Sequence, residues 1–242
     1  MGAGEQLVGV SAYTDFPEAA ARLPVIGDAF MLDLERMAML GPDLLLAWHS
    51  GTPVHVVDEL RSRGYRVEVI RTQSLEDIPV ALRRIGELTG HGAAAELVAG
   101  EFVAGLQLLK EQAADAMPIS VFYQVADRPL YTIGGEHYVN ELIEICGGRN
   151  IFAELSSLAP LIGVEAVLEN DPEVMLASTD AGPDAFKEWE RWSNMAANRY
   201  RNRFWMPAAE TGRATPRLLV AGAAICGALA EGRSNRDSPV DW

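Results

Sequence analysis

AAAELVAGEFVAGLQLLKEQAAD, residues 93–115, gives the clearest indication of the fold. It contains no proline, and its apolar residues recur every three to five positions. This spacing predicts one helix, about 30 Å long, with a single apolar stripe. On both sides of it, short apolar runs alternate with helical stretches, which is the pattern of an α/β domain. The helix is either an ordinary surface helix or a rigid strut that joins two lobes.

The segment before the long helix has the features of a small α/β lobe. Its apolar runs predict strands at 7–11, 43–48 and 65–70, with helices at 34–40 and 54–63. A third helix is expected to begin at a Ser74 cap and to run toward Gly90.

The segment after the long helix repeats the theme. Strands are predicted at 119–124, 174–177 and 203–206, and helices at 138–146, 164–168, 184–194 and 216–230. The expected organisation is an N-terminal lobe, an inter-lobe helix, a C-terminal lobe and a polar tail, at residues 1–91, 92–117, 118–230 and 231–242.

Composition narrows the class of protein. The 242 residues carry a net charge of −14, which disfavours nucleic acid and anionic membranes as partners. No apolar run approaches the roughly 20 residues that span a bilayer, and the opening MGAGEQLVGVS resembles no signal peptide. Taken alone, this indicates the cytoplasm. Cys146 and Cys226 are expected to be separate buried thiols, although a long-range disulfide remains possible.

Motifs of catalysis are scarce in this sequence. It contains no G-x-S-x-G turn, no phosphate-binding loop and no H-E-x-x-H pair, and its four histidines lack the spacing of metal ligands. Aromatic residues instead stand in loops at strand ends: Tyr13, Trp48 and Tyr131. Such residues often only pack, but ligands bind at the carboxyl ends of strands in α/β sheets. A binding protein is therefore favoured over an enzyme.

Five stretches of the chain, in order, resemble the periplasmic vitamin B12-binding proteins of cobalamin ABC importers. They are GVSAYTDFP (9–17), LERMAMLGPDLLLAW (34–48), VFYQVADRPLYTIGG (121–135), ELIEICGGRNIF (141–152) and RATPRLLVAGAAICGAL (213–229). The resemblance implies two Rossmann-like lobes bridged by one long rigid α-helix, as in class III substrate-binding proteins. It implies a monomer in the periplasm, without catalytic cofactor, that captures a corrinoid in the inter-lobe cleft and delivers it to permease subunits in the inner membrane.

The resemblance also implies roles for particular residues. Tyr13, Trp48, Arg213 and Tyr131, the last in place of a Phe, match positions that line the corrinoid pocket. Two further pocket positions depart from the family, since Val125 replaces an aromatic residue and Phe30 compensates for the small Ala29 beside it.

Two acidic residues match the positions with which this family docks onto arginines of the permease. They are Glu35 in LERMAML and Glu165 in GVEAVLENDPE, one in each expected lobe. Paired carboxylates of this kind fix the register of a complex through charge-assisted hydrogen bonds.

Alternative ligands and one other class of function remain open. The same family binds haem, which needs an axial Tyr or His, here from Tyr13, Tyr131, His49 or His137. It also binds ferric siderophores, whose negative charge suits arginines 128, 199, 201, 203 and 213. A cytoplasmic α/β enzyme is the remote alternative.

The family's signal peptide, first strand and first helix lie upstream of the position of Val8. They have no counterpart in this sequence, so we expect a truncated or misplaced start and an N-terminal sheet that lacks one strand.

Overall fold

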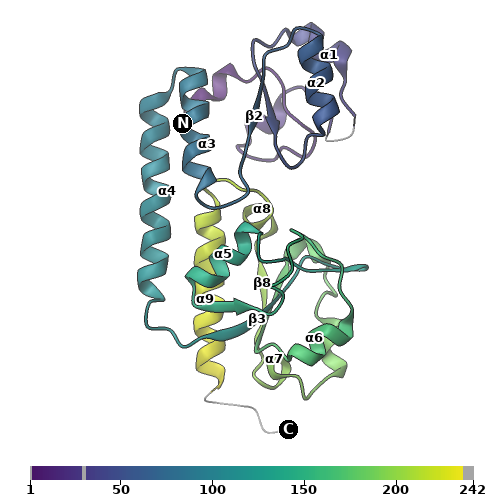
Figure 1. Ribbon diagram of the computed structural model, residues 1–242, viewed down its shortest axis with the longest axis vertical. Helices are drawn as coiled ribbons and strands as arrows, with labels where there is room; N and C mark the ends of the chain where they lie inside the picture. The colour runs from purple at the N-terminus through teal and green to yellow at the C-terminus, as the bar shows by residue number, and fades with distance from the viewer. Residues whose placement is uncertain (1, 29–30, 237–242) are drawn as a thin grey trace. The chain divides into compact units, whose positions relative to one another are not determined.

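The computed structural model describes residues 2–28 and 31–236, and the chain divides into two compact units (Figure 1). The N-terminal unit extends to Thr72 and includes Glu76–Gly100, whereas the C-terminal unit begins at Glu101 and takes in Gln73–Leu75. The helix α4 (Gly92–Gln112) contributes to both units, because the division falls within it. Parallel sheets and helices make up both units, so the predicted α/β class is confirmed.

The N-terminal unit is built on two parallel strands, β1 (Leu45–Trp48) and β2 (Val67–Ile70). Its helices are α1 (Leu34–Leu40), α2 (Val54–Ser62), α3 (Asp77–Thr89), and the 3-10 turns η1 (Ala3–Gln6) and η2 (Ala20–Arg22). A small buried cluster holds this sheet to α1 and α2, and it consists of Met37, Ala47, Val57, Leu60 and Val67.

Two predictions for the N-terminal unit were wrong. The segment 7–11 forms no strand, because Val10 alone finds a parallel partner, Val25, while Leu7 and Val8 stay more than two-fifths exposed. A strand needs hydrogen-bonding partners for successive backbone groups. Here a single isolated bridge takes the place of such a ladder. The third helix, α3, begins at Asp77, so its N-cap residue is Glu76 rather than the predicted Ser74.

The C-terminal unit contains a four-stranded parallel sheet in the order β6-β3-β7-β8. The strands are β3 (Ile119–Gln124), β6 (Gly148–Asn150), β7 (Val174–Ser178) and β8 (Arg203–Met206), and β4 (Ala126–Asp127) pairs with β5 (Leu130–Tyr131) as a separate antiparallel hairpin. Its helices are α5 (Tyr138–Ile145), α6 (Val164–Asn170), α7 (Ala196–Arg199), α8 (Ala208–Thr211) and α9 (Leu218–Arg236), with 3-10 turns η3 (Thr179–Ala181) and η4 (Lys187–Arg191).

Alternation of side chains along β3 divides the core of this unit between the two faces of the sheet. Phe122 packs edge-on against Trp189, in a cluster that also holds Val167 of α6. Ile119, three residues earlier, faces Gly232 of α9, where glycine lets the helix approach the sheet closely. Both faces are therefore covered, as a buried parallel sheet requires.

Two further predictions in this unit were wrong, each through tertiary contacts. Residues 184–194 were expected to form a helix, but only the 3-10 turn η4 forms, because the buried Trp189 donates from its Nε1 to Gln124 Oε1 at 2.7 Å. The polar tail expected from residue 231 is helical as far as Arg236. Arg233 and Arg236 hold that end of α9 by donating to the backbone carbonyls of Met117 and Pro118, just before β3.

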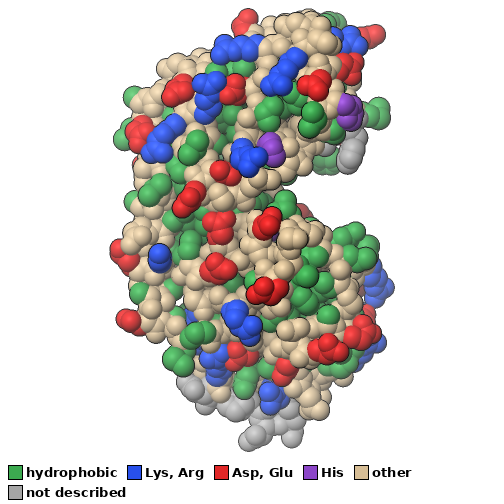
Figure 2. Space-filling model, in the orientation of Figure 1, with side chains coloured by type: hydrophobic (Ala, Val, Ile, Leu, Met, Phe, Trp, Pro, Cys, Tyr) green, Lys and Arg blue, Asp and Glu red, His purple; other side chains and the backbone are tan. Residues whose placement is uncertain are grey.

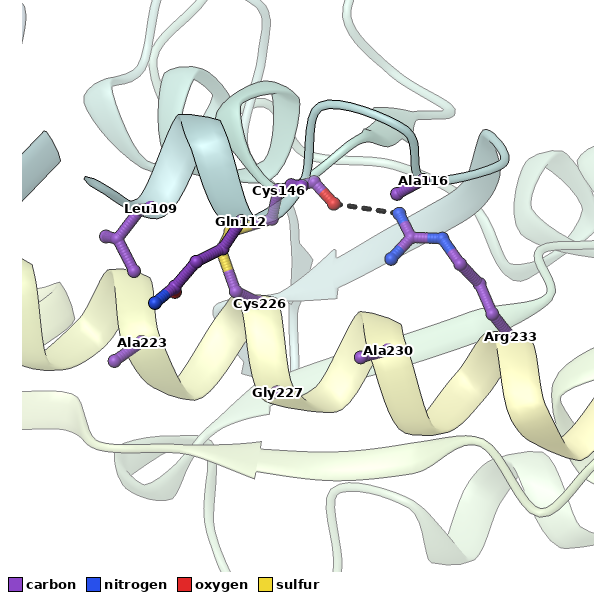
Figure 3. A pocket seen from close by; sticks show the side chains of 10 residues that line it. Leu109, Gln112, Ala116, Cys146, Ala223, Cys226, Gly227, Ala230 and Arg233 are labelled. Atoms are coloured by element: carbon purple, nitrogen blue, oxygen red, sulfur yellow. Dashed lines mark hydrogen bonds between the residues drawn. A yellow bond between two sulfur atoms is a disulfide. The ribbon is translucent and has the colours of Figure 1, made fainter. Parts of the chain in front are cut away.

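The two cysteines are joined, which corrects the expectation of separate thiols. Cys146, at the end of α5, forms a disulfide with Cys226 in the middle of α9. The disulfide borders a groove of about 490 Å³ between α9 and the end of α4 (Figure 3). There Arg233 donates to the Cys146 carbonyl at 2.8 Å. The groove lies at the amino ends of β3 and β6, and none of the predicted ligand-binding residues lines it.

Contrary to the expectation from the sequence, one segment of the chain, helix α4, reaches membrane-spanning length. By length and composition its 21 residues would suffice, with 22% of the apolar window buried. One such helix is weak evidence for a membrane span, since core helices of soluble proteins satisfy the same criterion.

Candidate ligand-binding residues

In the N-terminal unit, candidate residues gather at the carboxyl ends of β1 and β2. Trp48 ends β1 and is half exposed, and the turn that follows folds back on it, since Thr52 N donates to Trp48 O at 2.8 Å. A Cβ on Gly51 would overlap the Trp48 ring, so glycine is what allows the indole to lie across this turn. The backbone thus fixes the ring at the edge where α/β sheets bind ligands.

A polar pair lies beside this tryptophan. His49 N donates to Ile70 O at 2.9 Å, and its Nε2 is 3.2 Å from Arg71 Nη2 at the end of β2. The contact places a cation at the same edge of the sheet as Trp48, and such an edge suits a ligand with an apolar face and polar or anionic substituents. Arg71 was missed by the sequence analysis. Its position directly after a predicted strand was the available signal.

Tyr13 lies in the loop after the isolated bridge at Val10. Its backbone is left-handed, with φ of 64°, and its side chain is 87% exposed. Such exposure is unusual for an aromatic residue that serves only the core. Phe30, the other candidate of this unit, lies outside the described residues.

In the C-terminal unit, the β4–β5 hairpin brings together two of the predicted residues. Val125 N donates to Tyr131 O at 2.9 Å, and both side chains are partly buried. Tyr131 also forms an isolated bridge with Leu161. Thr132 anchors the hairpin to the sheet, because its Oγ1 donates to Tyr123 O at 2.7 Å. Tyr131 is therefore held at the carboxyl end of β3.

Arg213 follows α8 at the carboxyl end of β8 and is exposed. Two buried tyrosines hold the turn that leads to it. Tyr138 donates to Thr211 O at 3.1 Å, and Tyr123 is hydrogen-bonded to the Thr211 side chain. Burial raises the pKa of both phenols to about 12, so both stay neutral at neutral pH. Sequence reasoning missed this pair, since nothing local in the sequence marks it.

His137 has a structural role that competes with ligand binding. Its Nδ1 accepts from Val139 N at 3.1 Å and caps α5, and burial lowers the pKa of the imidazole to about 4. The imidazole therefore stays neutral at neutral pH, and its Nδ1 remains occupied by the helix cap.

The arginines proposed for an anionic ligand do not gather at one place. Arg199, Arg201 and Arg203 lie before or at the start of β8, the opposite end of that strand from Arg213. Arg128 lies in the β4–β5 turn and pairs with Glu188 at 3.6 Å. Among the described residues, no group of three or more His, Cys, Asp or Glu is placed to hold a metal ion.

Glu35 and Glu165 occupy corresponding positions in the two units. Each is the second residue of a seven-residue helix, α1 or α6, and each is exposed. On the face drawn in Figure 2, acidic and basic side chains are interspersed over both units.

The chain is similar to proteins whose names state what they bind. A vitamin B12-binding protein of Vibrio cholerae serotype O1 is 30% identical over 226 residues, which are 93% of this chain and 82% of that protein. A second vitamin B12-binding protein, from Pectobacterium atrosepticum, is 30% identical over 245 residues, 95% of this chain and 83% of its own length.

Solved structures agree with the fold. A crystal structure of the periplasmic vitamin B12 binding protein of Vibrio cholerae superposes with a TM-score of 0.86 at 29% identity, covering 96% of this chain and 91% of that one. A periplasmic haem-binding protein in complex with two haems superposes with a TM-score of 0.82 at 22% identity, covering 93% and 89%. The second likeness shows the fold alone.

The model of the periplasmic binding protein family matches residues 1–210. This match covers most of the chain. The chain therefore belongs to the periplasmic binding protein family, as the substrate-binding component of an ABC importer.

Proposed function

We propose that the chain captures a corrinoid of the vitamin B12 type in the periplasm and delivers it to the permease of its importer, with no bond made or broken. The observation that carries this proposal is similarity to vitamin B12-binding proteins over nearly the whole chain, at 30% identity and with a TM-score of 0.86. The proposed ligand contacts are Tyr13 and Trp48 in the N-terminal unit and Val125, Tyr131 and Arg213 in the C-terminal unit. Phe30 is also a proposed contact, on the sequence resemblance alone.

The chemistry of these residues suits a corrin ring. An indole fixed by its own turn presents a flat apolar face, and stacking adds to burial worth about 25 cal/mol per Å². Arg71 and Arg213 supply donors for the amide groups at the rim of a corrin. Capture by preformed groups of this kind needs no catalytic residue.

Titration calorimetry with cyanocobalamin tests the proposal. We expect saturable binding with one ligand per chain, and Trp48→Ala should weaken it by about 1–3 kcal/mol, because one stacked ring is lost. Tyr200→Ala is the matched control, since Tyr200 lies before the start of β8, away from the carboxyl edge. If the wild-type chain takes up no corrinoid, the proposal is wrong.

Haem is a second candidate, favoured by the exposed phenol of Tyr13 and by the haem-binding structure of the same fold. The two histidines offered as axial ligands are engaged: His49 Nε2 lies against Arg71, and His137 Nδ1 caps α5. A visible spectrum of the protein mixed with haemin separates the candidates. A shifted Soret band that Tyr13→Phe abolishes would favour haem.

Glu35 and Glu165 are proposed to dock the loaded receptor onto the permease. Within the described residues neither carboxylate forms an ion pair with Lys or Arg, so both are available to cations of another protein.

A further inference from the structure

The two proposed docking helices share more than their acidic residue. In α1 and α6 the fourth residue, Met37 or Val167, is at most 1% exposed and fixes the helix to its unit. Each helix ends at a left-handed cap, at Gly41 in α1 and at Asp171 in α6. Both helices are thus rigid, short platforms that present their second residue to solvent in the same way.

Large apolar side chains are exposed beside both acids. In α1, Met39 is 81% exposed and lies four residues after Glu35, on the same face of the helix. Met31, 76% exposed, precedes this helix; Asp28 Oδ1 accepts from Met31 N, and Asp28 N donates to Met31 O. Met39 is therefore presented by the backbone of α1.

The C-terminal unit also has an exposed apolar side chain close in sequence to its acid, but there the apolar residue precedes the acid. Leu161 is 62% exposed and precedes Glu165 by four residues, in a segment pinned by its bridge to Tyr131. The Glu165 carboxylate lies over the residues just before the helix, since Oε2 is 2.9 Å from where a Cβ of Gly163 would stand. An acid and an exposed aliphatic side chain are again four residues apart.

Single exposed apolar residues are ordinary, but here they recur beside the same functional position in both units. We propose that Met39 and Leu161 are apolar anchors of the docking surface, and that the permease receives each beside the cation that pairs with the neighbouring acid. This inference rests on the proposed docking through Glu35 and Glu165. The acids and the net charge of −14 favour a cationic surface, and the aliphatic chains favour an adjoining apolar pocket.

The two kinds of contact differ in their response to salt. Ion pairs at the rim of an interface weaken as ionic strength rises, whereas burial of an apolar side chain does not. Residues of the apolar kind mainly slow dissociation, and those of the charged kind mainly speed association.

The test measures binding of the full-length chain to its own importer complex in lipid nanodiscs, at low and high salt. Met39→Gln and Leu161→Gln should each weaken binding about tenfold at both salt concentrations, through faster dissociation. Glu35→Gln and Glu165→Gln should weaken it more at low salt than at high salt. Met117→Gln is the matched control, because Met117 is also 70% exposed but lies just before β3. All variants should bind cyanocobalamin like the wild type.

The outcomes separate this inference from the proposed function. Loss of binding in the glutamate variants with none in Met39→Gln and Leu161→Gln would overturn the anchors and leave the docking acids standing. No loss in any variant would overturn the proposed docking as well. Equal binding to nanodiscs without the importer would mean that the side chains enter lipid, which also contradicts the inference.

Discussion

The two units share an α/β design but differ in how it is stabilised. In the N-terminal unit a two-stranded sheet packs on α1 and α2 through a cluster of five buried residues, Trp48 at its carboxyl edge is half exposed, and Tyr13 is 87% exposed. The C-terminal unit has four strands, with β7 buried throughout, and a disulfide between α5 and α9. From this comparison we expect the C-terminal unit to be the more stable of the two against local unfolding.

The largest expected effect concerns the disulfide. Replacing both partners, as Cys146→Ala with Cys226→Ala, frees a loop of 80 residues and should cost the C-terminal unit about 4 kcal/mol of unfolding free energy. Hydrogen exchange followed by mass spectrometry is the measurement: protection should fall in β3, α5 and α9 and stay unchanged in β1 and β2. Equal losses in both units would show that they unfold as one cooperative body, and the contrast between them would fail.

A smaller effect is expected in acid, again in the C-terminal unit. His137 has a pKa of about 4 when folded and near 6.5 when unfolded, so between these values only the unfolded chain takes up the proton. Stability should therefore fall as pH drops from about 6.5 to 4, by about 3 kcal/mol in all. His137→Asn keeps a capping side chain without the titration. Chemical denaturation at several pH values should show a flatter profile for this variant, and an unchanged profile would remove His137 as the cause.

Sequence reasoning succeeded where local signals are strong. The helix at 34–40 and the strands at 119–124 and 203–206 have the predicted bounds, because glycine, proline and apolar runs mark their ends. It failed where distant contacts decide. The turn around Trp189 is set by Gln124, 65 residues away, and the pairing of Cys146 with Cys226 spans 80 residues.

The same division holds for the candidate site. Trp48 and Tyr131 follow apolar runs, so their place at strand ends could be predicted from the sequence. The tyrosine pair that fixes Thr211 could not, since Tyr123 and Tyr138 read as ordinary core residues until the fold brings them to α8. The direct role of Trp48 and Tyr131 in ligand binding stays a prediction, as does that of the other proposed contacts.

The smallest effect tests whether the N-terminal unit holds its tryptophan in place before the ligand arrives. Gly51→Ala adds a methyl group where the Trp48 ring lies, so the indole must leave its position. Every residue that is proposed to contact the ligand is still present in this variant. Affinity for cyanocobalamin should fall by about 1 kcal/mol, in the lower part of the range expected for Trp48→Ala, because a displaced ring can still be recruited. Calorimetry gives the affinity, and Gly100→Ala is the control for a new methyl group in open space of the same unit. If Gly51→Ala binds as the wild type does, the ring is not preorganised, and the N-terminal surface forms only around its ligand.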